Sequence, residues 1–363
     1  MMQSNHEIML SVVDPDLKIE VPMYDETITK STDTFVKWGP NNRFPNELLT
    51  LSECSPSLNA IINGTKSFVK GNKISFNEVT HWAERVNRRN EKIEDIVEQL
   101  AHDRILFGGY AIQVIWNRLG DVAEIYVLPM EYLRSNEDNT KFWYNKRWGK
   151  YSSNSVEYDA WNPNERGDKF TQVFFNKNSG TRRVYPTSPQ TGALDDIVSE
   201  SIASKYVKNS LQSGLSARWI VNLPNSGKLT DDNKRDIEEA IKQKFCGVEN
   251  AGGFMLMYSN TDAKLDITKL DIDNANEIFT TIRNEAKDNI FLTNSATPNL
   301  FGVVSTTTGF NEQEYRDAYN LYYRLVVYPI QQEIVRDLGE ILGKEITIEP
   351  FDINLDNELN DVE

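Results

Sequence analysis

The sequence predicts an α+β protein, and three observations support this fold class. Apolar residues recur at helical spacing in the first hundred residues, over 56–71 and 90–106. After Gly108-Gly109 the pattern changes to short segments rich in β-branched and aromatic residues. From about residue 197 onward, helical and strand patterns alternate. Separate stretches of helices and strands are typical of α+β proteins.

The first 190 residues contain the elements of an antiparallel sheet with helices beside it. Residues 1–40 are irregular and acidic, which predicts an extended arm with short strands. Ser55 and Pro56 form the residue pair expected at a helix start, and the apolar face of that helix ends near Gly71. Strand patterns then follow over 110–116, 123–129, 141–148, 155–161 and 170–176.

A boundary at 187–196 precedes a small inserted unit. A helical pattern over 197–213 leads into this unit, and one of similar length over 275–292 leads out. Between them lie a strand, a helix and a second strand, expected over 217–224, 230–245 and 252–258. The apolar stripes of the two long helices are narrow, so we expect these helices to pack against copies of themselves.

A loop without charged residues precedes the longest helical pattern. Residues 292–311 contain no Asp, Glu, Lys or Arg, and 312–342 show apolar residues at helical spacing on one face. Pro329 lies inside this helix, where its ring removes one hydrogen bond and clashes with the preceding turn, so a kink is expected there. Taken alone, neither feature exceeds chance or ordinary core packing.

Composition excludes several classes of protein. The 363 residues allow more than one domain. No 18-residue apolar run is present, so no membrane span is expected, and the first residues lack the features of a signal peptide. Cys54 and Cys246, the two cysteines, fit a reducing compartment. The net charge of −15 repels phosphate and disfavours tight binding to DNA.

No motif for catalysis, metal binding or cofactor binding is present, so none of these is predicted. The three histidines lack metal-ligand spacing, and His102 beside Asp103 is interpreted as structural. Residues 271–274 faintly resemble a calcium loop but lack the glycine that should follow, so we interpret them as a helix cap.

The order of these parts resembles the portal proteins of tailed double-stranded DNA bacteriophages, over about residues 50–343. Four stretches have sequence patterns similar to those of that family, although none contains an invariant catalytic motif. They are GGYAIQVIWNRLGDVAEIYVLPMEYLR (108–134), KFCGVENAGGFMLMYSN (244–260), NIFLTNSATPNLFGVVSTTTGFNEQEY (289–315) and YRLVVYPIQQEIVRDLGEIL (323–342).

The resemblance implies a phage-portal-like α+β fold with an antiparallel-sheet wing, two stem helices, a small α/β clip, a long kinked helix and a minimal crown. The implied division is wing 1–193, first stem helix 194–213, clip 214–270, second stem helix 271–292, tunnel loop 293–311, kinked wing helix 312–343 and short acidic tail or vestigial crown 344–363.

The resemblance further implies a dodecameric ring, assembled in the host cytoplasm, at one capsid vertex of the virion. Double-stranded DNA would pass through its channel during packaging and ejection. The implied partners are further copies of the chain, the terminase large subunit, the head–tail adaptor, and the major capsid and scaffolding proteins; neither an enzymatic activity nor a membrane is implied.

The resemblance also implies roles for individual residues. The tunnel loop would present neutral side chains to DNA from Ser295, Thr297, Asn299, Ser305, Thr306, Thr307, Thr308 and Asn311. On the stem, Lys205, Lys208, Arg283 and Lys287 could touch phosphates transiently, although surface salt bridges or contacts between subunits are the commoner roles. Clip docking would use Arg218, Trp219, Asn225 and Lys228, and Pro329 would bend the helix from the channel wall across the wing.

Two other functions stay open at this stage. Scattered Asp and Glu residues could form a metal-dependent phage enzyme that processes nucleic acid, but no pattern indicates which of them. The chain could also be another ring component of the head–tail junction, such as an adaptor, or a scaffolding protein.

Overall fold

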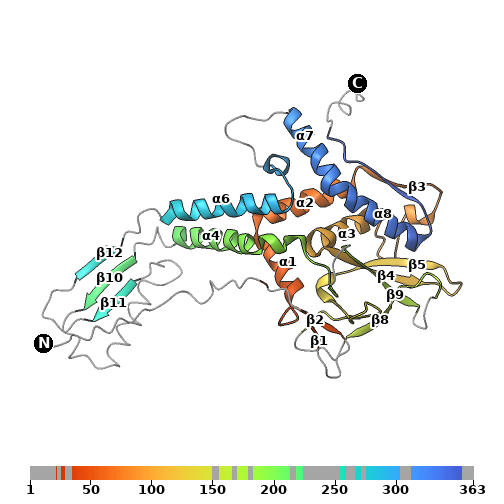
Figure 1. Ribbon diagram of the computed structural model, residues 1–363, viewed down its shortest axis with the longest axis horizontal. Helices are drawn as coiled ribbons and strands as arrows, with labels where there is room; N and C mark the ends of the chain where they lie inside the picture. Colours follow the sequence, from red (N-terminus) through yellow and green to blue (C-terminus); the bar gives the residue numbers. More distant parts are fainter. Residues whose placement is uncertain are drawn as a thin grey trace. The chain divides into compact units, whose positions relative to one another are not determined.

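The computed structural model describes residues 22, 26–28, 35–148, 155–165, 170–178, 183–212, 218–223, 254–258, 266–270, 275–302 and 312–353 (Figure 1). The chain forms two compact units. The larger unit contains Val21–Ile197 and Lys287–Glu363, and the smaller contains Val198–Ala286. Their boundaries fall within the helices α4 (Leu194–Gln212) and α6 (Ala275–Thr293).

The larger unit contains a six-stranded sheet with strand order β5-β4-β9-β8-β7-β6. Neighbouring strands are antiparallel except β8 and β9, which are parallel, so the expectation of an entirely antiparallel sheet is wrong at that pair. β4 is largely buried on both faces, which explains its nearly continuous apolar sequence. The strands are β4 (Gly109–Trp116), β5 (Val122–Leu128), β6 (Leu133–Ser135), β7 (Lys141–Tyr144), β8 (Val156–Ala160) and β9 (Thr171–Lys177).

Three helices precede the sheet: α1 (Phe44–Cys54), α2 (Pro56–Lys70) and α3 (Ile93–Phe107). The start of α2 is as predicted, because Ser55 Oγ accepts a hydrogen bond from Leu58 N at 3.2 Å and Pro56 occupies the first turn. α1 was not predicted. Nearby, β1 (Glu26–Ile28) and β2 (Val36–Trp38) form a short antiparallel pair, in agreement with the expected short strands.

The long C-terminal helix is continuous but changes its winding. It consists of α7 (Glu312–Tyr322), a π-helical turn η8 (Tyr323–Val327) and α8 (Tyr328–Leu342). Pro329 is the second residue of α8, directly after the π-helical turn. The wider turn gives the proline ring space that an α-helical turn would deny it. The irregularity is therefore where Pro329 predicted it, and its form is a π-helical turn.

A buried carboxylate attaches α8 to the sheet. Asp337 Oδ2 accepts hydrogen bonds from Tyr110 Oη at 2.8 Å and from Asn176 Nδ2 at 2.5 Å. Asp337 is 2% exposed, and Arg336 pairs with its other oxygen. Burial together with the Asp337 charge raises the pKa of Tyr110 well above its ordinary value, so the tyrosine stays a donor.

The segment after α8 belongs to the larger unit. β13 (Ile346–Glu349) pairs antiparallel with β3 (Lys73–Phe76), and the Phe351 ring lies 5.4 Å from that of Phe68. The expectation that 344–363 form an acidic tail or vestigial crown is therefore wrong for 346–351. In this stretch apolar and polar residues alternate over enough positions to form a strand. Residues 354–363 lie outside the described residues.

The smaller unit contains a three-stranded sheet with order β11-β10-β12. β10 (Arg218–Leu223) and β11 (Phe254–Tyr258) are parallel, as a strand–helix–strand connection requires. β12 (Asp266–Leu270) joins β10 antiparallel and was not predicted. The expected helix at 230–245 and the cap at 271–274 lie outside the described residues. Among the described helices, none is both long and apolar enough for a bilayer.

Candidate functional site: the anchored neutral segment

The neutral segment begins where α6 is fixed to the larger unit. Gln190 and Asn294 exchange two side-chain hydrogen bonds, at 2.8 and 3.0 Å. Gln190 is fully buried, and its amide nitrogen also donates to the Ile105 carbonyl of α3 at 3.2 Å. Asn294 in turn donates to the Ile290 carbonyl at 2.9 Å. These bonds satisfy a buried amide completely, so the end of α6 has one defined position on α3.

The next residues form a packed turn. Ser295 adopts a left-handed conformation with φ of +51°, and Ala296 N donates to the Phe291 carbonyl at 2.9 Å. The 3₁₀ helix η7 (Pro298–Phe301) follows, with Ala296 and Leu300 buried. The expectation of an open loop across all of 293–311 is therefore wrong for 294–302. The apolar residues that alternate with polar ones there pack against the core.

Phe301 anchors this turn on α2. Its ring centroid lies 5.5 Å from that of Tyr322, 6.0 Å from Phe291 and 6.2 Å from Phe68. Gly64, in the middle of α2, makes room for the ring: a Cβ atom at this position would lie 2.7 Å from Phe301 Cε1. A glycine inside a helix costs about 1 kcal/mol relative to alanine, so its presence here reflects this close approach.

The far end of the segment, α7, is held on the same helix. Tyr322 is 2% exposed, and its hydroxyl lies 2.6 Å from Thr65 Oγ1 of α2. Burial raises the pKa of Tyr322 to about 12. Tyr319 packs its ring against Phe68, with centroids 5.2 Å apart. The undescribed stretch 303–311 is therefore preceded by Phe301, which packs against Gly64 of α2, and followed by α7, whose C-terminal half at Tyr319 and Tyr322 packs on α2.

The predicted tunnel-loop residues within this turn face outward. Ser295, Thr297 and Asn299 are exposed and alternate with the buried residues Ala296 and Leu300. Ser305, Thr306, Thr307, Thr308 and Asn311 lie outside the described residues.

The predicted stem and clip residues that the structure describes lie on three elements, α4, α6 and β10. Lys205 in α4 and Arg283 in α6 are exposed, and Lys287 Nζ lies 3.7 Å from Asp288 Oδ1. Lys208 belongs to α4, but its side chain is outside the described part of the chain. Arg218 and Trp219 begin β10, whereas Asn225 and Lys228 are not described.

Sequence reasoning missed the residues that hold this segment. Gln190, Asn294 and Thr65 are single polar residues whose partners are far away in the chain, so no local pattern could have revealed them. Gly64 did leave a signal, because a glycine in the middle of an otherwise regular helix indicates a close contact.

Comparison with known families decides where the chain belongs. A family model described as phage portal protein matches residues 72–358, which is more than half of the chain. The chain belongs to the phage portal protein family. Phage portal proteins are structural channel proteins and not enzymes, so the alternative of a metal-dependent enzyme is wrong. Among the described residues, no three His, Cys, Asp or Glu side chains lie together in a way that could hold a metal ion.

Solved structures share the portal fold. The protein in a structure titled "Neck of native GTA particle computed with C12 symmetry" is 17% identical, with 87% of each chain covered and a TM-score of 0.56. An HK97 family phage portal protein from Corynebacterium diphtheriae is 13% identical, with 84% of this chain and 94% of that chain covered and a TM-score of 0.54. A search of curated proteins gives no match.

Proposed function

We propose that the chain forms a ring at one vertex of a phage capsid and that double-stranded DNA passes through the ring during packaging and ejection. The observation that supports this most directly is the anchoring of the neutral segment. Phe301 within the segment and Tyr322 in the helix that follows both pack on α2, while Ser295, Thr297 and Asn299 face outward. A segment held in this way can stand at the channel wall without collapsing onto it.

The chemistry of the chain suits DNA that moves. Phosphate contacts from Lys and Arg supply most of the affinity of a protein for DNA, so a channel needs few of them. The segment 292–311 has no charged residue, and the chain as a whole has a net charge of −15. Neutral hydroxyl and amide groups can touch the sugar–phosphate backbone without holding one register.

The proposal extends to the ring size, the place of assembly and the partners. The similar structure of a particle neck was computed with C12 symmetry, which supports a twelve-subunit ring in the virion. We further propose that the ring assembles in the host cytoplasm. The smaller unit, with Arg218 and Trp219 in β10, would dock the terminase large subunit and later the head–tail adaptor. The major capsid and scaffolding proteins would surround the ring. Lys205, Arg283 and Lys287 would meet DNA phosphates or a neighbouring subunit.

A deletion of 303–311 tests the role of the segment. This deletion spares Ala296, Leu300 and Phe301, which the core needs, so the chain should fold and electron micrographs should still show rings with a central hole. DNA packaging by phage carrying this variant should fail. A matched variant has nine Gly and Ser residues in place of 303–311. It keeps the length of the segment, so it distinguishes an effect of the side chains from an effect of segment length. Normal packaging by the deletion variant would refute the role of the segment, and the absence of rings in the native protein would refute the portal function.

A further inference from the structure

A closed ring with one chain type requires two unlike patches on each subunit, because every copy presents one patch to the neighbour ahead and the other to the neighbour behind. The larger unit has two such patches on its surface, and no described residue of the same chain covers either of them. They are complementary in charge and lie on different sides of α3.

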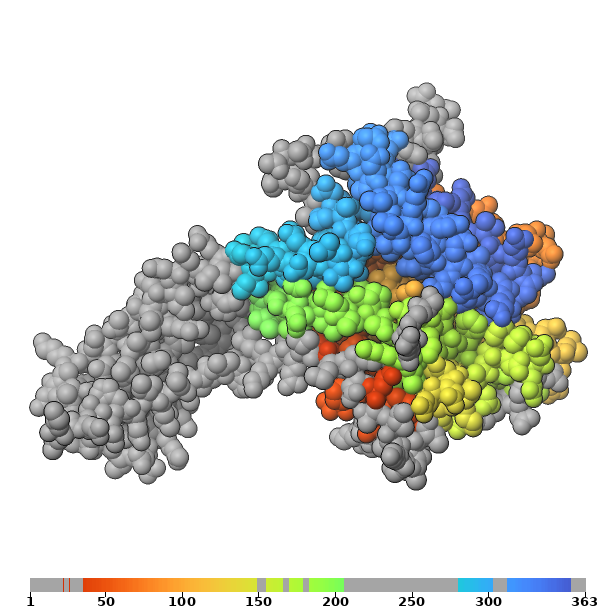
Figure 2. All heavy atoms as spheres, viewed as in Figure 1, coloured from red at the N-terminus to blue at the C-terminus, as the bar shows by residue number. Residues whose placement is uncertain are grey.

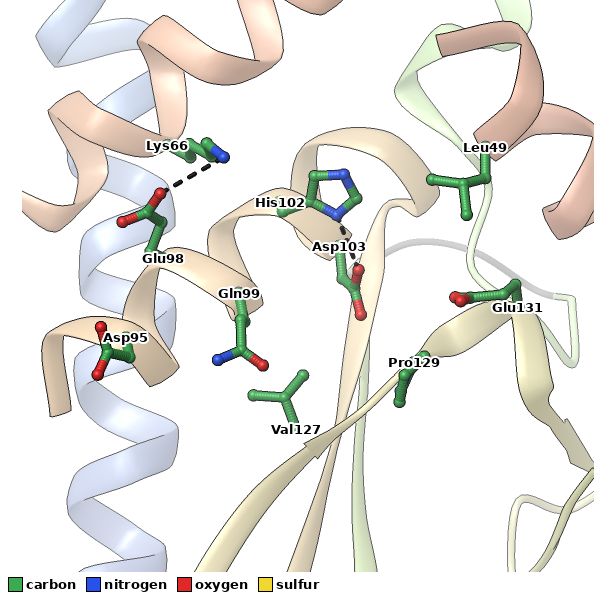
Figure 3. Close-up of a pocket in the computed structure, with 10 residues that line it drawn as sticks. All are labelled: Leu49, Lys66, Asp95, Glu98, Gln99, His102, Asp103, Val127, Pro129 and Glu131. Atoms are coloured by element: carbon green, nitrogen blue, oxygen red, sulfur yellow. Dashed lines mark hydrogen bonds and ion pairs between the residues drawn. The ribbon is translucent and has the colours of Figure 1, made fainter. Parts of the chain in front are cut away.

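The first patch is an acidic cavity of about 450 Å³ between α2, α3 and β5 (Figure 3). Four carboxylates line it, Asp95, Glu98, Asp103 and Glu131, against the single lysine Lys66. Glu98 is already paired with Lys66, at 3.4 Å, and with Lys70, at 3.0 Å.

Asp103 is the most buried carboxylate of this acidic cavity. The residue is 6% exposed and its Oδ2 is buried. His102 Nδ1 lies 3.0 Å from its Oδ1, and a hydrogen bond from the Met130 backbone also lowers its pKa, but these partners only partly offset the burial. Figure 3 shows the carboxyl group between His102 and Glu131. Burial raises the pKa of Asp103, and burial followed by the charge of Asp103 raises the pKa of Glu131. Among the described residues, neither carboxyl forms an ion pair with Lys or Arg, and the nearby His102 and Arg134 offset the burial only in part.

The second patch is an apolar stripe with a cation in it, on the outer surface of the long helix. Leu321, Leu325 and Tyr328 are 58%, 59% and 47% exposed, and their spacing of four and three residues places them on one face across the π-helical turn. Arg324 beside them is exposed and has no partner among the described residues. Figure 2 shows atoms of α7 and α8, in blue, at the surface on the face in view.

The two patches lie on opposite sides of α3. The α3 residues that line the acidic cavity, from Asp95 to Asp103, recur at intervals of three and four and so form one helix face. Arg104 lies half a turn away from the centre of that face, and its Nε donates to Glu333 of α8 at 2.8 Å. α8 therefore packs behind α3 as seen from the cavity, and the stripe lies on the outward side of the long helix.

We propose that the stripe of one subunit docks at the acidic cavity of the next, with Arg324 donating to Glu131 of the neighbouring copy and the buried charge of Asp103 behind it adding to the attraction. The inference rests on the proposed ring. The occupant is a second copy of this chain because one chain supplies both sides of the contact. It offers a guanidinium that has no partner among the described residues and is flanked by apolar residues, and a cavity with four carboxylates and the apolar residues Leu49, Val127 and Pro129. Guanidinium and carboxylate groups match in geometry as well as charge.

Charge reversal tests the contact. Arg324→Glu and Glu131→Lys should each raise the protein concentration needed for rings by on the order of thirtyfold or more, as measured by mass photometry and electron microscopy. The double variant should recover most of the loss, because it restores opposite charges. Arg147→Glu, at an exposed arginine outside both patches, is the control and should leave rings unchanged.

Two further variants separate docking from folding. Asp103→Asn should raise the thermal stability of the monomer, because a buried charge is removed, yet weaken ring formation; a purely structural role would move both in the same direction. Leu325→Glu should prevent rings, whereas Leu119→Glu at the tip of the β4–β5 hairpin, where the side chain is 88% exposed, should not.

Rings from Arg324→Glu at the native concentration, or no recovery in the double variant, would overturn the contact. The absence of rings from the native chain would instead overturn the proposed function.

Discussion

Gly64→Ala is the smallest change that should disturb the anchor of the neutral segment. Alanine is the better helix former, and on propensity alone the substitution should stabilise α2 by about 1 kcal/mol. The structure predicts the opposite sign. The new Cβ atom would lie 2.7 Å from Phe301 Cε1 and 2.8 Å from Cδ1, closer than nonbonded carbon atoms approach.

The ring of Phe301 cannot move aside cheaply, because Phe68, Phe291 and Tyr322 surround it with centroids 5.5–6.2 Å away. Overpacking of this kind costs about 1–3 kcal/mol. After the gain in propensity, a net loss of about 1 kcal/mol in the free energy of unfolding is expected. In a Phe301→Ala background the clash disappears, and Gly64→Ala should then stabilise by about 1 kcal/mol. The difference between the backgrounds is a coupling energy of about 2 kcal/mol.

Urea denaturation of all four chains, followed by circular dichroism, measures this cycle. Hydrogen exchange over 294–302 provides a local readout, and faster exchange is expected in Gly64→Ala than in the native chain. If Gly64→Ala stabilises both backgrounds equally, the reasoning is refuted and Phe301 does not rest on Gly64.

Two further predictions concern the larger unit. Asp337→Ala removes the acceptor of Tyr110 and Asn176 and should lower the free energy of unfolding by about 2–4 kcal/mol in urea denaturation. Glu333→Ala on the same helix loses one partly buried ion pair with Arg104, whose side chains are 17% and 19% exposed, and should cost less, about 1 kcal/mol; similar losses would refute the role of Asp337. Because the folded-state pKa of Asp103 is raised, the unfolded chain releases this proton first as pH rises, so the contribution of Asp103 to stability is most favourable below the ordinary carboxyl pKa and declines as pH rises through the folded pKa. Thermal melts across that range should show a weaker decline for Asp103→Asn, and an unchanged slope would contradict the assignment.

Local sequence was sufficient where the physical cause is local. Ser55 and Pro56 start α2 because a hydroxyl cap and a pre-set φ act within one turn. Gly108 ends α3 in a left-handed conformation with φ of +86°, and β4 begins at Gly109, as the change of pattern indicated. Pro329 indicated a helix irregularity for the same reason, since its ring affects only the preceding turn.

Pairings between distant segments were not accessible in this way. The parallel contact of β8 with β9, and the addition of β13 to β3, depend on which strand edges the rest of the fold leaves free. The same holds for two side-chain contacts. Gln190 and Asn294 lie 104 residues apart in the sequence. Phe301 and Gly64 meet only through packing. The absence of charge in 292–311 therefore predicted a single loop, whereas the structure shows that its first part, 294–302, is a packed turn.

The sequence by itself determined the α+β class, the order of the main helices and strands, the position of the helix irregularity and the resemblance to portal proteins. Each of these depends on periodicity, on caps and on residues with restricted backbones, which act over a few neighbouring positions. Only the tertiary structure decided that 294–302 is anchored, that the C-terminal segment closes onto β3, that Asp103 is buried beside His102, and that Arg324 is exposed on the long helix. Burial and long-range contacts decide these features, and a linear pattern does not encode which distant surfaces meet.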